Sequence, residues 1–489
     1  MSRTFTRSWV HPELKIHDLQ TGVVTTRSEF DWMIDRWKVI MQDKYNVVPG
    51  QTCLLWFQRP NIYYCSALFA AIELGLILVS DMPHAYSHDD LSNYKIAVHG
   101  KIDLAIVDRA SQDSSNVWDM IVYYRTCKNI LFDYDFDSYI IQRPELATAR
   151  KLQQISDANL ALWQIPTSGT TGPAILDRRS HAFQLALEER LMRVTNYTRG
   201  TGRALHICDL HEGVSLQQHF LAAFNACEHQ YLLDNTHGTC INNVTSAVYK
   251  NKITHVSLHT PELLTEWVCQ TPVIDWDITV NTMFQIPKDV VPLVKQKQIN
   301  RIITSFGSVT LGGPVLIKTV TPDTSIDNYQ INEFVSIDDG FYLYELRNEE
   351  LWISIPSTGG KWVTGKDWFK FENGHYIFLG RTDIFHINNT SVSLQSLEDL
   401  TIKHFGYQAT IATDLECEKI YLALWNNIDV QPMIDDLADL YPTLRINYII
   451  RNEPKQRFWN GRKVDRNAIR DYCREKMLHS TTVIAYNTI

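Results

Sequence analysis

Residues 161–172 read ALWQIPTSGTTG, a short apolar stretch that runs directly into a loop rich in hydroxyl groups and glycine. The apolar part, 161–165, predicts a buried strand. The loop, 167–172, suits an anion cradle, because glycine permits turns that aim backbone N–H groups inward and the hydroxyls add donors. No Gly-Lys-Ser/Thr follows, so the segment is not a Walker loop. By itself, this composition fits a solvated turn better than a ligand site.

Strands and helices alternate on both sides of this loop. Strand-length apolar runs alternate with amphipathic stretches of helix length from about residue 50 onward. Such alternation predicts two parallel sheets covered by helices, an α/β fold. The expected strands are 52–57, 76–80, 104–107, 129–132, 204–208, 230–233, 255–258, 280–284 and 301–305. The expected helices are 61–74 (capped by Gly75), one starting near Ser87, 215–227, 244–250, 261–268 and 288–297.

The pattern changes after Gly312. Residues 312–382 are rich in strands and turns and contain no helical pattern, and a smaller α+β stretch follows. That stretch is expected to hold helices near 394–405 and from Arg466, with strands at 410–412 and 420–425. We therefore expect a large N-terminal domain over 1–382, with its small β-rich part at about 312–382. A small α+β C-terminal domain is expected over 383–489.

The composition argues against several classes of protein, among them nucleic-acid-binding and membrane-spanning proteins. The 489 residues include 46 Lys and Arg against 55 Asp and Glu, a net charge of −9 that argues against a broad nucleic-acid surface. No window approaches the ~18 apolar residues of a membrane span. The N-terminus lacks the apolar core of a signal peptide. Nine cysteines without a CxxC pair indicate a reducing compartment, so a soluble, cytoplasmic protein is expected.

TSGTTG resembles the phosphate-binding loop of the adenylate-forming superfamily, which includes acyl- and aryl-CoA synthetases, firefly-type luciferases and the adenylation domains of peptide synthetases. Ser180-His181 stands at the family's distance from the loop and opens a helical run. Further segments resemble family motifs in the family's order. They are ITHVSLHTPELL (253–264), IITSFGSVT (302–310), WVTGKDWF (362–369), HYIFLGR (375–381), INNTSVSLQSLE (387–398) and NGRKVDR (460–466).

The resemblance implies a large N-terminal domain and a mobile C-terminal domain that swivels at Asp383. It implies an ATP-dependent, AMP-forming ligase that activates a carboxylic acid as its acyl-adenylate and releases pyrophosphate. The acyl group would pass to the thiol of CoA or of a carrier protein, or to an amine. ATP and Mg²⁺ are the implied cofactors, with CoA as one of the acceptors. The implied partner is a small-molecule acid, with neither nucleic acid nor a membrane span.

The resemblance also implies roles for residues of the N-terminal domain. Phe306 and Gly307 match the family's aromatic residue and glycine, and Phe306 would stack near the adenine or the acid, with ordinary core packing as the alternative. His211 and Asp209 are competing candidates for the acid pocket. The loop residues would hold the β- and γ-phosphates: Thr167, Ser168, Gly169, Thr170, Thr171 and Gly172.

A second group of residues would complete the nucleotide site. Asp367 would accept the ribose hydroxyls, because a carboxylate accepts two donors. An ungapped count places Lys366 there instead, but lysine cannot accept. Arg381 would assist the ribose and phosphate. Lys463 would be the catalytic lysine, because its spacing to Val-Asp-Arg matches the family, with Arg462 as the alternative.

The sequence also departs from the family. Thr310 stands where the family has the Glu that helps to position Mg²⁺, and threonine is a poorer ligand for that ion. Ile175 replaces the loop Lys, and Arg178 and Arg179 are candidates to restore its charge. Asn389 replaces a family glycine. These changes motivate an alternative, a catalytically degenerate adenylate-binding scaffold or partner subunit, while an amide-forming enzyme with a bound amine is a third reading.

Overall fold

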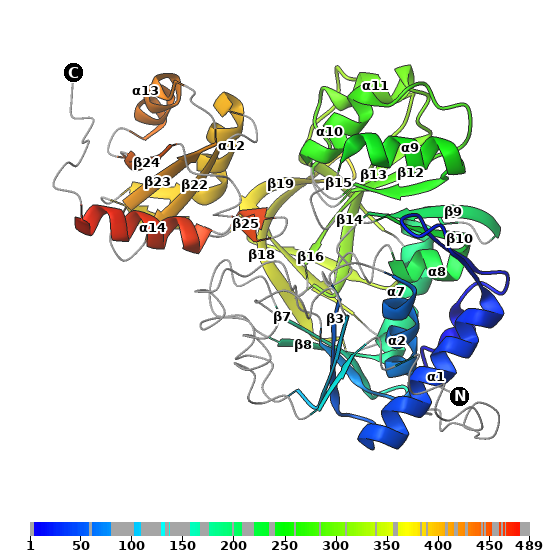
Figure 1. Ribbon diagram of the computed structural model, residues 1–489. Helices are drawn as coiled ribbons and strands as arrows, with labels where there is room; N and C mark the ends of the chain where they lie inside the picture. The colour runs from blue at the N-terminus through cyan, green and yellow to red at the C-terminus, as the bar shows by residue number, and fades with distance from the viewer. Residues whose placement is uncertain are drawn as a thin grey trace. The chain divides into compact units, whose positions relative to one another are not determined.

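A computed structural model of the chain forms two compact units (Figure 1). The first holds the described residues up to Tyr344 and Ile353–Val363. The second holds Glu345–Trp352 and the described residues from Thr364 onward. The structure describes residues 4–57, 61–79, 102–108, 129–132, 136, 157–166, 176–197, 200–207, 220–233, 240–258, 261–282, 285–308, 311–337, 340–355, 360–381, 384–387, 390–405, 409–414, 419–425, 429–441, 444, 446–451, 459–460, 463–464 and 466–479.

One sheet of the first unit has the strand order β6-β5-β3-β4-β7-β8. All neighbours are parallel except β7 and β8, which form an antiparallel pair. The bounds are β3 (Thr52–Trp56), β4 (Ile77–Val79), β5 (Leu104–Val107), β6 (Asn129–Phe132), β7 (Ala161–Pro166) and β8 (Leu176–Ser180). Helix α2 (Ile62–Glu73) connects β3 to β4, and Gly75 follows it at φ +72°, the left-handed conformation expected after a helix.

The other sheet of this unit has a parallel centre, β1-β10-β9-β11-β12-β13. Strand β2 flanks it on one side and β14 on the other, both antiparallel to their neighbours, and β15 lies beyond β14. The bounds are β1 (Lys15–Asp18), β2 (Val24–Thr26), β9 (Gly200–His206), β10 (Cys227–Leu232), β11 (His255–Ser257), β12 (Thr279–Thr282), β13 (Arg301–Ser308), β14 (Gly313–Val320) and β15 (Glu333–Ser336).

Helices cover both faces of this second sheet. Val256, Val280 and Ile302 point to one face and pack in a shared core with α9 (Ile241–Asn251), α10 (Pro261–Gln270) and α11 (Val290–Gln296), which lie together in Figure 1. Leu232 points to the opposite face and belongs to a second core with α1 (Arg27–Tyr45) and α2. Helices α7 (His181–Val194) and α8 (Ala222–Ala226) also contribute to that core, through Leu185 and Phe224.

The second unit is smaller and mixed. Strands β16 (Leu343–Arg347), β17 (Glu350–Ser354), β18 (Trp362–Glu372) and β19 (His375–Arg381) are neighbours in that order, and the first three of them have residues in both units. Strands β20 (Ile384–Ile387) and β21 (Thr390–Ser393) form a hairpin, and β22 (Ala409–Asp414), β23 (Lys419–Leu424) and β24 (Ile446–Ile450) form a sheet. Its helices are α12 (Leu394–Phe405), α13 (Gln431–Leu440) and α14 (Arg466–His479), and β25 (Trp459–Asn460) pairs with β26 (Lys463–Val464).

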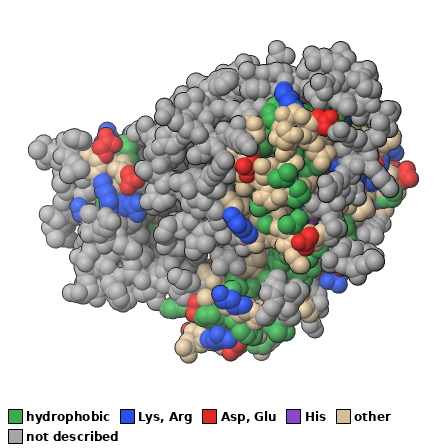
Figure 2. All heavy atoms as spheres, turned by 90° about the horizontal axis from the view of Figure 1, so that it is seen from below, with side chains coloured by type: hydrophobic (Ala, Val, Ile, Leu, Met, Phe, Trp, Pro, Cys, Tyr) green, Lys and Arg blue, Asp and Glu red, His purple; other side chains and the backbone are tan. Residues whose placement is uncertain are grey.

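The predicted α/β class is confirmed, with two helix-covered, mostly parallel sheets, a β-rich part and a smaller α+β part. Cys227 is a correction, because it begins strand β10 instead of ending a helix. The domain boundary at Asp383 stays a prediction, because that residue lies outside the described residues. No helix in the described ranges is long and apolar enough to cross a membrane. Figure 2 shows basic and acidic side chains interspersed over the described part of one face.

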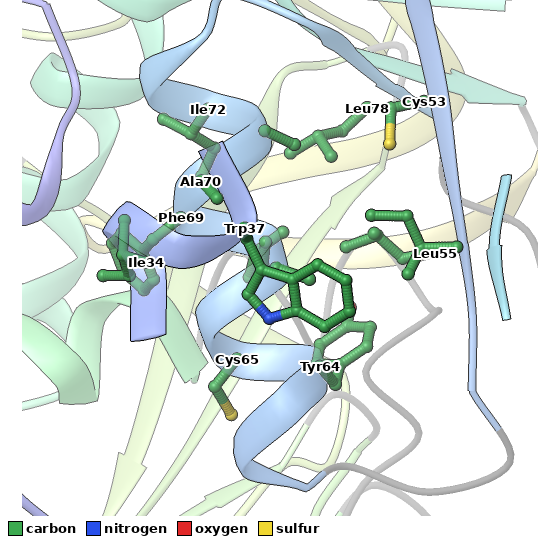
Figure 3. Packing of buried hydrophobic residues seen from close by; sticks show 14 of the residues in the cluster. Ile34, Trp37, Cys53, Leu55, Tyr64, Cys65, Phe69, Ala70, Ile72 and Leu78 are labelled. Atoms are coloured by element: carbon green, nitrogen blue, oxygen red, sulfur yellow. The ribbon is translucent and has the colours of Figure 1, made fainter. Parts of the chain in front are cut away.

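Helix α1 is the main element that the sequence patterns missed. Its first turn carries a capping box, in which the Thr26 side chain accepts from the Glu29 N–H and Glu29 accepts from the Thr26 N–H. Trp37 is fully buried, and its Nε1 donates to Ser66 Oγ of α2 at 3.0 Å. Figure 3 shows the Trp37 indole beside Tyr64 in this core. The Thr-x-x-Glu signal at 26–29 could have predicted where this helix begins.

A buried ion network fastens the N-terminal segment to α1 and α2. Glu73 has a fully buried side chain that accepts from Arg7 Nε at 2.7 Å and from Lys38 Nζ at 2.8 Å. Burial raises the pKa of the Glu73 carboxyl, but the hydrogen bonds and charges of Arg7 and Lys38 outweigh it, so the pKa is lowered. One buried carboxylate therefore joins two cations from separate elements, and Asp35 supplies further negative charge to Arg7.

Replacing Glu73 by Gln should lower the free energy of unfolding by about 3–5 kcal/mol, because two cations are then left without their buried countercharge. Urea denaturation of the full chain measures the loss. The matched control is Asp35→Asn, since Asp35 also contacts Arg7, at 2.5 Å, but is 54% exposed. That change should cost about 0–1 kcal/mol. Equal losses in the two variants would contradict the network described above.

Candidate active site

Strands β7 and β8, which precede and follow the hydroxyl-rich segment 167–172 in the sequence, pair with each other. In the β7–β8 pair, Pro166 lies opposite Leu176 and Gln164 lies opposite Arg178. The chain therefore leaves the sheet and returns to it at adjacent positions. Several predicted site residues lie outside the described residues: Thr167, Ser168, Gly169, Thr170, Thr171, Gly172, Ile175, Asp209, His211, Thr310, Asp383 and Asn389.

The structure separates the two arginines that follow the loop. Arg178 is exposed, and its Nε donates to Oε1 of the buried Gln164 at 3.1 Å. Arg179 is buried, and its guanidinium lies 5.4 Å from the centre of the Phe183 ring. Successive residues of a strand point to opposite faces, which explains the difference. Of the two, Arg178 is the one that presents its guanidinium to solvent, and the buried Gln164 holds its Nε in place.

Ser180-His181 has a structural role at the start of α7. The Ser180 side chain caps the helix by accepting from the Phe183 N–H at 3.2 Å. His181 is fully buried, with its Nδ1 3.3 Å from the carbonyl oxygen of Phe5. Burial lowers the pKa of His181 to about 4, although the Phe5 contact opposes that change, so the ring is neutral at pH 7. This motif fixes the helix that follows the loop.

Phe306 and Gly307 lie near the end of β13. The half-buried Phe306 meets Phe334 edge to face, with ring centres 5.9 Å apart. A Cβ atom on Gly307 would lie 2.0 Å from the carbonyl oxygen of Gly313, a distance that no side chain tolerates. The ladder between β13 and β14 also shifts register between these two residues. Gly307 is therefore required by backbone packing at this bulge.

Buried polar residues stand at the carboxyl ends of the parallel strands. Ser257 pairs with Asn281 across β11 and β12, and both point away from the core that holds Val256 and Val280. The buried Asn281 amide forms no hydrogen bond within the part of the chain that the structure describes. Open α/β sheets bind ligands at such edges. The sequence patterns did not single these residues out, although a polar residue inside an apolar run was the available signal.

His206 ends β9 at the same edge. Its Nε2 lies 2.7 Å from Gln230 Oε1, and its ring packs against Phe220 with centres 5.0 Å apart. Burial lowers the pKa of His206 to about 4, although the bond to Gln230 raises it, so the imidazole is neutral at pH 7. His255 is buried, with its Nε2 3.2 Å from the Asn196 carbonyl oxygen.

The second unit carries the remaining predicted residues. Asp367 in β18 is buried, and its directly opposed residue in β19 is Arg381. The register therefore places an acid and a base as cross-strand neighbours. Lys463 lies in β26 opposite Asn460 of β25, and the two strands are antiparallel. Among the described residues, no group of three or more His, Cys, Asp or Glu side chains could hold a metal ion.

Neither a scan of protein-family models nor a search of curated proteins gives a match. Solved structures do match along almost the whole chain. An amide bond synthetase, McbA from Marinactinospora thermotolerans, shares 14% identity, covering 95% of this chain and 98% of its own, with a TM-score of 0.69. The o-succinylbenzoate CoA synthetase MenE from Bacillus subtilis, in complex with its acyl-adenylate, also shares 14%, covering 95% and 97%, with a TM-score of 0.72. ATP-bound MatB from Rhodopseudomonas palustris shares 12%, covering 95% and 96%, with a TM-score of 0.70.

This chain has the fold of the adenylate-forming enzymes. The resemblance stated from the motifs is thereby confirmed for the fold, over both the large and the small part of the chain. Within the adenylate-forming fold, the described motif residues fall at a strand end (Phe306, Gly307), on opposed strands (Asp367, Arg381) and in a short hairpin (Lys463). Their chemical roles are proposals.

Gly307→Ala should lower the free energy of unfolding by about 3 kcal/mol, because overpacking a tight contact forces the backbone apart. Urea denaturation of the full chain measures this loss. Gly374→Ala is the control, since a Cβ there meets nothing within 4 Å and only its φ of +84° opposes the change. The control should cost about 1–2 kcal/mol. Wild-type stability for Gly307→Ala would contradict the packing contact with Gly313.

Proposed function

We propose that this protein is an ATP-dependent ligase that activates a carboxylic acid as its acyl-adenylate and releases pyrophosphate. The acyl group then passes to the thiol of CoA or of a carrier protein, or to an amine. The observation that carries the proposal is the match over 95% of the chain to solved acyl-adenylate-forming ligases. The neighbours include both CoA synthetases and an amide bond synthetase, so both classes of acceptor stay open.

In this proposal the loop at 167–172 binds the β- and γ-phosphates through backbone N–H groups and hydroxyls. Arg178 supplies the positive charge that the sequence lacks at Ile175. Its position two residues into β8 supports this role, because about 7 Å of strand separates it from Leu176, where the chain re-enters the sheet. An arginine side chain spans a similar length, and the contact of its Nε with Gln164 leaves both terminal nitrogens available to an anion.

Further residues would have separate roles toward the nucleotide and the acid. Phe306 stacks near the adenine or the acid. Asp367 accepts the two ribose hydroxyls, and Arg381, its cross-strand neighbour, orients that carboxylate and assists the phosphate. Asp209 or His211 would contact the acid. Asp383 would serve as the hinge between the domains.

Lys463 would be delivered between the acid's carboxylate and the α-phosphate. Both reacting groups are anions, and an ammonium between them offsets their repulsion as the oxygen attacks phosphorus. Mg²⁺ would neutralise part of the phosphate charge. Thr310 offers it only a hydroxyl, and the described residues offer no cluster of three acidic or imidazole ligands. Neutralisation of the phosphate charge would therefore depend more strongly on Arg178 in this chain.

The test is release of pyrophosphate from ATP and Mg²⁺, screened over aromatic, fatty and amino acids. Release that depends on any one acid supports the ligase. Binding of ATP without release across the panel would contradict turnover and identify the protein as an adenylate-binding scaffold or partner subunit. A second stage adds CoA or amines to the active mixture, and consumption of the acyl-adenylate then identifies the acceptor.

Lys463→Ala should slow adenylate formation about a hundredfold or more, since a positioned charge in a closed site contributes roughly 2.7–4 kcal/mol. ATP affinity and the free energy of unfolding should change little. Transfer from separately supplied acyl-AMP should be affected far less, because that step no longer needs the lysine. Arg462→Ala is the control. If Arg462→Ala alone gives this pattern, Arg462 and not Lys463 is the catalytic cation.

Arg178→Gln should weaken ATP binding roughly tenfold or more, because a hydrogen bond to a charged group is worth about 1.5–3 kcal/mol. AMP, which lacks the β- and γ-phosphates, should bind with unchanged affinity. Arg178→Lys should restore part of the lost affinity. Arg193→Gln, at another exposed arginine, is the control. Equal losses for ATP and AMP would place Arg178 away from the terminal phosphates.

A further inference from the structure

We infer that Arg190 is a positioning residue that holds the β13–β14 hairpin, and through it Phe306 and Gly307, against helix α7. Its effect on nucleotide binding rests on the proposed function, whereas its effect on the hairpin does not. Arg190 is fully buried in α7. Its Nη1 donates to the carbonyl oxygen of Pro314, and its Nη2 lies 3.5 Å from that of Val315.

Aromatic rings enclose the same guanidinium. Its central carbon lies 4.4 Å from the centre of the Tyr342 ring and 5.5 Å from that of Phe341. A planar guanidinium can stack on a ring and donate in its plane at the same time, whereas the ammonium of lysine cannot. The pocket thus fits arginine specifically. Buried charge of this kind persists only where its donors meet acceptors.

The carbonyls that Arg190 meets belong to a bulge. Phe306 pairs with Leu316 and Gly307 pairs with Pro314, so Val315 is the extra residue of β14. A bulged residue falls out of the ladder, and its main-chain groups need other partners. The Val315 oxygen also accepts from the Tyr344 hydroxyl at 2.9 Å. Arg190 and Tyr344 therefore stabilise the bulge that directs Phe306.

Other residues of α7 pack against the backbone of the same hairpin. Phe183, Leu187 and Arg190 lie on one face of the helix at spacings of four and three residues. A Cβ on Gly312 would lie 3.1 Å from Phe183 Cζ, and one on Gly313 would lie 3.2 Å from Leu187 Cδ1. Both glycines have positive φ, +81° and +130°. The helix that begins after the phosphate loop thus packs directly on the turn that follows Phe306.

These contacts couple helix α7, which follows the proposed phosphate loop, to Phe306 of β13. Any change that frees Pro314 and Val315 also frees Gly307, which pairs with Pro314, and the adjacent Phe306. A merely structural arginine would stabilise the fold without favouring this hairpin. Loss of a positioning arginine would loosen the backbone of this hairpin selectively and would weaken nucleotide binding through Phe306. Loss of a merely structural arginine would do neither.

The test compares Arg190→Lys with Leu185→Ala in the full chain. Leu185 of α7 is also buried, but it belongs to the core with α1 and α2 and lies about 200° around the helix from Phe183, away from the hairpin face. Amide hydrogen exchange is measured under native conditions. Arg190→Lys should speed exchange at the amides of 306–308, 313, 315 and 316 by about tenfold or more relative to the rest of the sheet. Leu185→Ala should lower global stability without that local effect. Uniform loosening in Arg190→Lys would overturn the inference.

ATP affinity supplies the second readout. Arg190→Lys should weaken ATP binding about fivefold or more, and in a Phe306→Ala background it should weaken it no further, because coupled residues are non-additive. Additive losses would overturn the positioning role. Absence of ATP binding by the wild type would overturn the proposed function, while the exchange measurement still decides the role of Arg190. If Arg190→Lys does not fold, Tyr344→Phe removes the other donor to Val315 and should reproduce the local exchange at smaller amplitude.

Discussion

A buried polar group must find a partner, and in the first unit this requirement fixes the points at which the elements join. Glu73 forms ion pairs with both Arg7 and Lys38, so the N-terminal segment, α1 and α2 meet at one carboxylate. Arg190 meets two carbonyls of β14, so α7 and the hairpin meet at one guanidinium. Apolar packing fills the space between these points, but it is not directional. The paired polar groups set which surfaces face each other.

The proposed chemistry follows from the same arrangement. A loop returns to the sheet beside its own starting point, with Arg178 held by a buried amide two residues further on. Parallel strands bring His206, Ser257 and Asn281 to their carboxyl ends, the usual place for a ligand in such a sheet. In the second unit, one strand register sets Asp367 opposite Arg381. Each proposed role thus has a local structural cause.

The low identity to the solved neighbours, 11–14%, is compatible with a shared fold. Cores accept many apolar residues if volume and patterning are kept. In this chain, the alternation of strands and helices builds the fold, and close contacts such as Gly307 against Gly313 fix it locally. The loss of the loop lysine and of the metal-positioning Glu changes the distribution of charge and leaves this framework in place. In the proposed function, Arg178 would supply the positive charge that is absent at Ile175.

The sequence by itself determined the class of fold, most strands and helices, and the order of the motifs, because periodicity and glycine placement are local signals. It missed α1, although the Thr26–Glu29 capping box was present, and it assigned Cys227 to a helix where β10 begins. Only the tertiary structure decided that Arg178 is exposed and Arg179 buried, that Asp367 opposes Arg381, and that Arg190 reaches the bulge at Val315. Those relations depend on strand register and on packing between segments more than a hundred residues apart, and no local pattern encodes them.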